Sequence, residues 1–100
     1  MLYYAIMTED FPDSLQRRIA SRPQHLDRLH QLQRDGRLLL AGPHPSIDCE
    51  DPGAAGFSGS LIVARFASLD EARSWAEADP YVACGVYARV NVKPFRKTLP

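Results

Sequence analysis

Two side chains that could transfer protons occupy unexpected positions in the sequence. At 100° per residue, Leu29 and Leu32 lie within about 40° of His25, which therefore belongs to the apolar face of its helix. Asp79 ends the segment "SLDEARSWAEAD" within an apolar stripe, although a carboxylate in the last turn of a helix costs about 0.3–1 kcal/mol. Pro80 would stop that helix without an acid before it. Two such inward-facing groups predict an acid–base pair, in which the carboxylate orients the imidazole and stabilises its charged form.

Four further residues are predicted to lie beside this pair and to contact a small-molecule ligand. Ser60 can donate a hydrogen bond to a substrate oxygen. Gly42 lets the backbone approach a ligand closely because it has no side chain, and Pro43 follows it at the same strand end. Arg22 lies in the turn before the histidine and is either a ligand contact or a partner for the aspartate.

The elements that must position these residues alternate between strands and helices. Apolar runs predict four strands and helical periodicity predicts two helices. The strands are expected at 2–7, 37–43, 59–67 and 83–95, and the helices at 13–35 and 68–79. Pro23 is expected to interrupt the first helix, and Ser68 with Glu71 forms a capping box that opens the second. Residues 44–58 are rich in Pro, Gly and Asp, which predicts a long loop.

The order β-α-β-β-α-β predicts one α+β, ferredoxin-like domain over residues 1–100, an antiparallel sheet with both helices on one face. This topology brings the start of the first helix and the end of the second to the same edge of the sheet. His25, Ser60 and Asp79 are all expected at this edge, with the loop 44–58 as its cover. The other sheet face is left open although its strands carry apolar residues, so a homodimer joined face to face is expected.

Composition argues against several classes of function. Twelve basic and twelve acidic residues cancel, which leaves no electrostatic footprint for nucleic acid. No apolar run approaches the ~20 residues that span a membrane, and "MLYYAIMTED" lacks the features of a signal peptide. Cys49 and Cys84 have no metal-ligand spacing and fit a reducing compartment, so a cytoplasmic protein is expected. His44 lies near the predicted site, but no third ligand for a metal can be placed there.

Each of these residues also has a structural interpretation. A lone inward histidine on a leucine face is commonly a hydrogen-bonded core residue, and Asp79 could simply cap or brace its helix. Ser60 could satisfy an amide at a strand end, and Gly42 could be required by a turn. Cys49 could be a reactive thiol, but no base stands beside it in the sequence. The predicted convergence of His25 with Asp79 favours a functional site.

Segments throughout the chain resemble the YciI-like family. These are "RPQHL", "GRLLLAGP", "DPGAAGFSGS", "WAEADPYVACGVY" and "VKPF", in unbroken order over nearly the whole sequence. The resemblance implies a dimeric α/β barrel of ferredoxin-like subunits. It places the family's proposed active pair at His25 of "RPQH" and Asp79 of "DPY", and Ser60 of the "GS" step resembles a further pocket residue.

The resemblance also implies a kind of chemistry. One branch of the family contains enzymes that remove chloride from hydroxylated aromatic rings, and related dimeric barrels include muconolactone isomerases. Proton transfer on a small oxygenated ring, without metal or organic cofactor, is therefore expected. His25 would be the general acid or base of a lyase-, isomerase- or dehydrochlorinase-like enzyme, with Asp79 orienting it. Two other classes stay open: a non-catalytic protein that binds a small molecule, and a dimeric interaction module in which the pair only joins the helices.

Overall fold

The first strand, β1 (Leu2–Asp10), lies inside the sheet, and its side chains are buried in alternation. The computed structural model describes residues 1–100 and contains three more strands: β2 (Leu38–Pro45), β3 (Phe57–Phe66) and β4 (Tyr87–Phe95). Every neighbouring pair is antiparallel, in the order β2-β3-β1-β4, so β1 and β3 lie inside the sheet and β2 and β4 at its edges.

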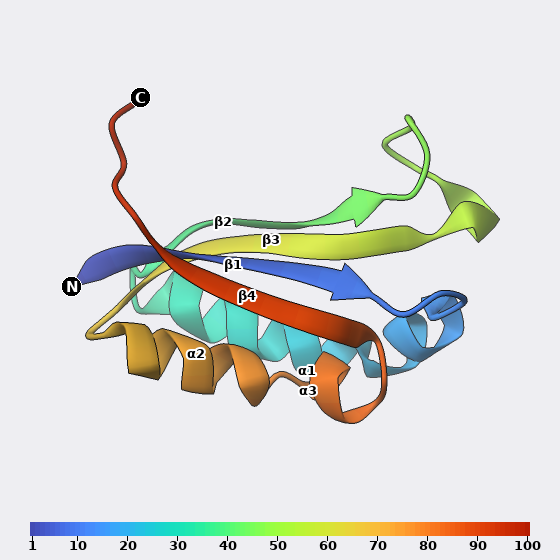
Figure 1. Cartoon of the computed structure of the whole chain (residues 1–100), viewed down its shortest axis with the longest axis horizontal. Helices are drawn as coiled ribbons and strands as arrows, with labels where there is room; N and C mark the ends of the chain where they lie inside the picture. Colours follow the sequence, from blue (N-terminus) through green and yellow to red (C-terminus); the bar gives the residue numbers. More distant parts are fainter.

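Three α-helices cover one face of this sheet (Figure 1). The long α1 (Leu15–Arg34) connects β1 to β2, and α2 (Leu69–Glu77) with the short α3 (Pro80–Ala83) connects β3 to β4. This two-layer arrangement confirms the predicted ferredoxin-like α+β fold. No helix in the structure combines the length and the apolar character that crossing a membrane requires.

The core lies between the sheet and the helices. Even-numbered residues of β1 and β3 point inward, and Ile6 and Ile62 face each other there, each 1% exposed. Leu29 and Leu32 of α1 pack on this layer in one buried cluster with them. The helix face predicted around His25 is confirmed, since His25 is buried beside both leucines. The histidine is therefore held by the packing of α1 on the sheet.

Several predicted element boundaries were wrong. The last strand, predicted from residue 83, begins at Tyr87, because residues 80–83 form the unpredicted α3. Pro23 does not interrupt α1, which continues from Leu15 to Arg34. A proline removes one backbone donor from a helix, and here the buried face of α1 on both sides of it packs on the sheet and outweighs that loss. β1 also extends three residues past the predicted end at 7, to Asp10. The strand was underestimated because Thr8, Glu9 and Asp10 are polar, although Thr8 continues the inward alternation and is buried.

The long loop between β2 and β3 is shorter than predicted and does not lie over the edge of the sheet where His25 was expected. The strands take up residues 44–45 and 57–58, and a 3-10 helix, η1 (Gly53–Ala55), folds part of the remainder. This loop extends beyond the end of the sheet (Figure 1), and its residues 54–56 share a surface hollow with residues 10–15. It contributes no residue to the cavity beside His25, so its expected role as a cover is wrong.

Candidate active site around His25 and Asp79

The aspartate lies between two helices, not at the end of one. α2 ends at Glu77 with Ala78 as its C-cap, and Asp79 is the N-cap of α3, where its Oδ1 accepts a hydrogen bond from the Tyr81 N–H at 2.9 Å. Pro80 takes the first position of α3, where its missing N–H costs nothing. The predicted unfavourable placement at a helix C-terminus is therefore corrected: the carboxylate caps a helix start, where negative charge is favoured.

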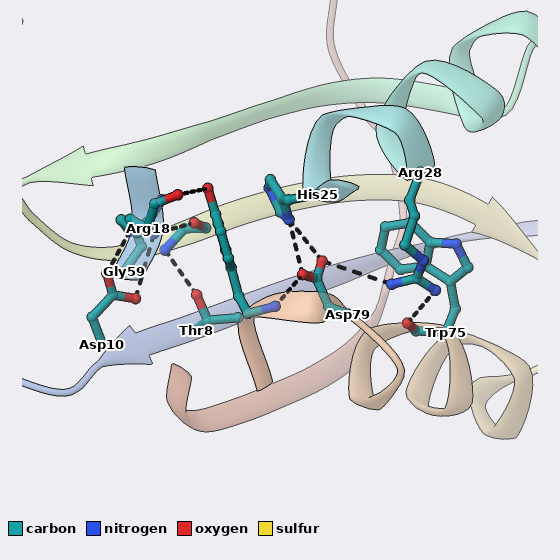
Figure 2. Close-up of polar contacts among 10 residues, drawn as sticks. Thr8, Asp10, Arg18, His25, Arg28, Gly59, Trp75 and Asp79 are labelled. Atoms are coloured by element: carbon teal, nitrogen blue, oxygen red, sulfur yellow. Dashed lines mark hydrogen bonds and ion pairs between the residues drawn. The ribbon is translucent and has the colours of Figure 1, made fainter. Parts of the chain in front are cut away.

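His25 and Asp79 meet in the interior, as Figure 2 shows. The imidazole Nδ1 lies 2.8 Å from Asp79 Oδ2 and 3.0 Å from Oδ1. Both residues are buried, His25 at 6% exposed and Asp79 at 2%. A carboxylate on Nδ1 holds a proton on that nitrogen and leaves Nε2 free to accept or donate one. Nε2 makes no hydrogen bond within the chain and is not among its fully buried unpaired atoms.

Aromatic rings fix the plane of the imidazole. Tyr81 stacks on His25 with ring centroids 4.1 Å apart and planes 14° from parallel. Tyr87 approaches the same ring edge-on, at 6.4 Å and 88°. Because the Tyr81 hydroxyl donates to the backbone oxygen of Arg18, that ring is itself tied to α1. His25 therefore has one orientation set by packing as well as by the aspartate.

A cavity of about 180 Å³ opens beside the histidine. Its wall contains His25 with all four of the predicted ligand contacts, Ser60, Gly42, Pro43 and Arg22. The remaining lining residues are Arg18, Leu26, Leu29, Ala41, Ile62 and Tyr81. Asp79 does not line the cavity and reaches it only through the imidazole. A cavity of about 150 Å³ is enough to hold a benzene ring, so this one fits a single small ring.

Arg28 of α1 reaches the aspartate as well. Its guanidinium stacks on Trp75 at 4.3 Å and donates from Nη2 to the Trp75 carbonyl oxygen at 2.8 Å. Its Nη1 lies 3.7 Å from Asp79 Oδ2 (Figure 2). A long arginine can cover an aromatic ring from the side of a helix, which the angular position of its Cα does not reveal. Asp79 thus contacts His25 and lies near Arg28, and it makes no ion pair or hydrogen bond with Arg22.

A second buried network, which the sequence did not predict, borders the other side of the cavity. Arg18 is 6% exposed, and its Nε donates to Asp10 Oδ2 at 2.6 Å. Its Nη2 donates to the Gly59 carbonyl oxygen at 3.1 Å and to Ser60 Oγ at 2.7 Å. The Ser60 N–H in turn donates to Thr8 Oγ1 at 2.9 Å. Figure 2 shows this arginine reaching from α1 across the ends of β1 and β3.

The sequence did contain a signal for Arg18. It lies seven residues before His25, which places it about 20° away on the same helix face. Its partner Asp10 lies two residues after Thr8, so a longer β1 places it on the inward register at the strand end. The burial of Tyr81, by contrast, could not be predicted from apolar periodicity, because the residue belongs to a helix of only four residues.

Burial shapes the acidity of the groups around the pair. It raises the pKa of Tyr87 to about 12, against the opposing effect of the Ser60 hydroxyl, and it also raises the pKa of Tyr81, against the positive charge of Arg18. Burial lowers the pKa of Arg28, and the Asp79 carboxylate opposes that change. Both tyrosines therefore remain neutral phenols at physiological pH.

The fold and the cavity define a small ferredoxin-like protein with a buried histidine–aspartate pair beside a space for one ring. The chain belongs to the family of YCII-related domains, whose model matches residues 1–96. It is 56% identical over 96 residues to protein YciI of Escherichia coli O6:H1. The matched region covers 96% of this chain and 98% of that protein.

Two further proteins are similar over most of their length. A protein of Emericella nidulans named "derivative of benzaldehyde biosynthesis cluster protein C" is 35% identical over 86 residues, 81% of this chain and 85% of that one. Among solved structures, the 5-chloro-2-hydroxyhydroquinone dehydrochlorinase TftG of Burkholderia phenoliruptrix superposes with a TM-score of 0.83 at 27% identity, covering 95% of this chain and 94% of the other. That structure is a complex with 2,5-dihydroxybenzoquinone.

Proposed function

We propose that this protein is a small enzyme that moves a proton to or from a hydroxylated ring compound, with His25 as its general acid or base. The observation that carries the proposal is the geometry of the pair. Nδ1 is bound to Asp79 at 2.8 Å, Nε2 has no partner within the chain, and His25 lines a cavity of one-ring size. General acid or base catalysis by such a group typically contributes about 10²–10⁴-fold to a rate.

The structural likeness to TftG supports a substrate class. That protein is a dehydrochlorinase of a chlorinated hydroxyhydroquinone. Dehydrochlorination removes a proton and a chloride ion from the same substrate, so it requires a base, which His25 would supply through Nε2. The proposal accordingly includes elimination and isomerisation reactions on small oxygenated rings, and no step in them needs a group beyond these side chains.

The test compares turnover in two variants that each replace one histidine of α1, one inside the site and one outside it. Chloride release from 5-chloro-2-hydroxyhydroquinone and proton exchange at its ring carbons would be followed for the wild type, His25→Asn and His30→Asn. His30 lies on the exposed side of the same helix and is the control. We expect His25→Asn to lower the rate of either reaction by about 10²–10⁴-fold and His30→Asn to leave it unchanged. Equal rates in the wild type and His25→Asn would rule the proposal out.

A specific observation also favours a structural role for the pair. Asp79 contacts His25 of α1, caps α3 and lies 3.7 Å from Arg28, so one carboxylate joins the two halves of the helical layer. Asp79→Asn keeps a good N-cap, whereas Asp79→Ala removes it at a cost of about 1 kcal/mol. If the pair is only structural, both variants lower the free energy of unfolding and no probe ligand binds the wild type. If it is catalytic, folded Asp79→Asn loses turnover.

We also propose that the protein forms a homodimer through the open face of its sheet. Alternation places Met7 of β1 and Leu61 of β3, which are register partners, on the face opposite the helices. Leu40 and Phe95, 46% and 41% exposed, lie on edge strands of the same sheet. Apolar residues gathered on an uncovered sheet face are typical of an interface between subunits.

A further inference from the structure

Ser60 is held in a state that leaves its hydrogen available to a ligand. Its Oγ lies 2.7 Å from Arg18 Nη2, and a guanidinium can only donate. Ser60 Oγ is therefore the acceptor in this contact, and its own hydrogen must go elsewhere. The other polar contact of the residue uses its backbone N–H. The Tyr87 hydroxyl lies near enough for Ser60 to oppose the rise of its pKa, but it makes no hydrogen bond of acceptable geometry, so the Ser60 hydrogen has no acceptor of good geometry within the chain. Ser60 lines the cavity, so that hydrogen is available there.

The Arg18 guanidinium is held by several partners at once. It binds Asp10 and the Gly59 carbonyl oxygen together with Ser60, and it lies over the Tyr81 ring at 5.0 Å. A cationic donor polarises the hydroxyl that accepts from it and makes that hydroxyl a stronger donor. The network therefore presents a polarised O–H at one point of the cavity wall.

The charges around the cavity favour a negative ligand. Its lining contains two arginines and a histidine but no aspartate or glutamate. Asp10 pairs with Arg18, and Asp79 lies against His25 and Arg28, so these charges largely offset one another and the remaining positive charge of the wall comes from Arg22. Arg22, by contrast, is exposed and has no ion pair or hydrogen bond within the chain. It is the one cation of the cavity wall without a partner.

We infer that Arg18 is a positioning residue that fixes the Ser60 hydroxyl as a donor to a ligand oxyanion, and that with Arg22 this selects ring compounds carrying a negative charge. The inference rests on the proposed function and narrows its substrates to phenolates, enolates and ring carboxylates. Ser60 and Arg22 would contact the anionic oxygen, and Arg18 would act through Ser60. The oxyanion would then bind at the part of the cavity wall formed by Ser60 and Arg22, and the proton would be transferred at His25 Nε2, on another part of the wall.

The test uses two probes that differ in charge and not in shape. Benzoate and benzamide would be titrated calorimetrically into the wild type, Ser60→Ala, Arg22→Gln and the control Ser58→Ala, an exposed serine of the same strand. We expect the wild type to bind benzoate at least about tenfold more tightly, since hydrogen bonds to charged groups contribute about 1.5–3 kcal/mol. Ser60→Ala and Arg22→Gln should each reduce this preference, Ser60→Ala by about tenfold, and Ser58→Ala should keep it.

The role of Arg18 is tested by a double-mutant cycle. Arg18→Met alone would leave Asp10 buried without a partner, so it is combined with Asp10→Asn, and the folding of the pair is checked by its thermal unfolding. We expect this paired change to reduce the preference for benzoate as Ser60→Ala does, and to reduce it no further in the Ser60→Ala background. A purely structural role would lower the stability without changing the ratio of the two affinities.

Three results would overturn the inference. If the wild type binds both probes equally while His25→Asn weakens both, the pocket works without charge selection and the proposed function stands alone. If the effects of the paired change and Ser60→Ala on the preference add, Arg18 acts directly on the ligand and is not a positioning residue. If benzoate does not bind although 2,5-dihydroxybenzoquinone does, a negative charge on a ring is not what the cavity selects, and the inference fails while the proposed function stands.

Discussion

At the scale of single residues, Asp79 makes more contacts than orienting a histidine requires. It accepts from the Tyr81 N–H, bonds to His25 Nδ1 and lies near Arg28. A carboxylate held by several fixed partners has little freedom to move, so it keeps the imidazole in one tautomer and one orientation. The same contacts make Asp79 part of the fold, which is why the conservative change to asparagine is the informative one.

The meeting of His25 and Asp79 could be predicted from the sequence, but partly for the wrong reason. Helical angles placed both inward, and the topology placed both at one edge of the sheet. The angle of Asp79 assumed a helix that in fact ends two residues earlier, and capping of α3 fixes its position instead. Arg28 was missed because a long side chain can reach a buried partner from a Cα position that says little about its end. Arg18 was missed because the predicted β1 ended before its partner Asp10.

Tyr87 gives a prediction for the dependence of stability on pH. Its phenol has an ordinary pKa of 10.0, and a pKa of about 12 when buried in the fold. Because the unfolded chain loses this proton first, the stabilisation is complete below about pH 10 and is lost as the pH rises toward 12. In that window the free energy of unfolding should fall by up to about 1.4 kcal/mol per pH unit from this group.

Tyr87→Phe removes that group and so should make the fall above about pH 10 less steep. The Tyr87 hydroxyl has no hydrogen-bond partner, so the variant should lose little stability at neutral pH. Urea unfolding of both proteins at a series of alkaline pH values measures the two slopes. Parallel curves for the wild type and the variant would contradict the assignment.

At the scale of elements, the close contact between β1 and β3 at Gly59 positions Ser60, the residue of β3 that follows it and lines the cavity. Gly59 pairs with Glu9, and a Cβ added to it would lie 2.0 Å from the Thr8 carbonyl oxygen. No side chain fits there, and the neighbouring Ser60 is thereby held against Arg18. Gly59 is thus required inside a strand pair and not by a turn.

Gly59→Ala should therefore destabilise the protein strongly, by about 3 kcal/mol or more, because the backbone of β1 must move. Gly42→Ala on the neighbouring strand is the matched control, since a Cβ added there would have no atom within 4 Å. Thermal and urea unfolding compare the two. Similar stabilities for both variants would show that the contact between β1 and β3 is not as close as described.

The boundaries of the elements explain which parts of the fold could be predicted. The alternation of strands and helices along the chain followed from apolar periodicity, and the helical layer followed from that order. The Ser68 cap formed as expected, with Glu71 N–H donating to Ser68 Oγ at 3.1 Å. The reciprocal bond of Glu71 goes to the Ala67 N–H instead. The polar end of β1 and the uninterrupted α1 were not predicted, because burial against the sheet overrides local propensity at both places.

At the scale of the whole molecule, the helical layer covers only one face of the sheet (Figure 1). The opposite face carries Met7 and Leu61 at its centre. The proposed homodimer would remove this surface from water, which contributes about 25 cal/mol per Å² of apolar area. The cavity beside His25 lies between the sheet and α1, so the dimer would leave it accessible from the helical side.

The dimer is tested by introducing charge at its proposed centre. Leu61→Glu should shift sedimentation from dimer to monomer, because an unpaired carboxylate is costly to bury. Ser58→Glu, at an exposed position of the same strand, should keep the oligomeric state of the wild type. A wild-type protein that sediments as a monomer at all concentrations would contradict the proposal.

The central claim is that the His25–Asp79 pair serves a ligand in the adjacent cavity. The most direct test is to record the imidazole signals of His25, His30 and His44 by nuclear magnetic resonance while 2,5-dihydroxybenzoquinone is added. The account predicts that the His25 signals shift until binding saturates, and that those of the exposed His30 and His44 do not. Saturable binding without any change at His25, or no binding at all, would contradict it.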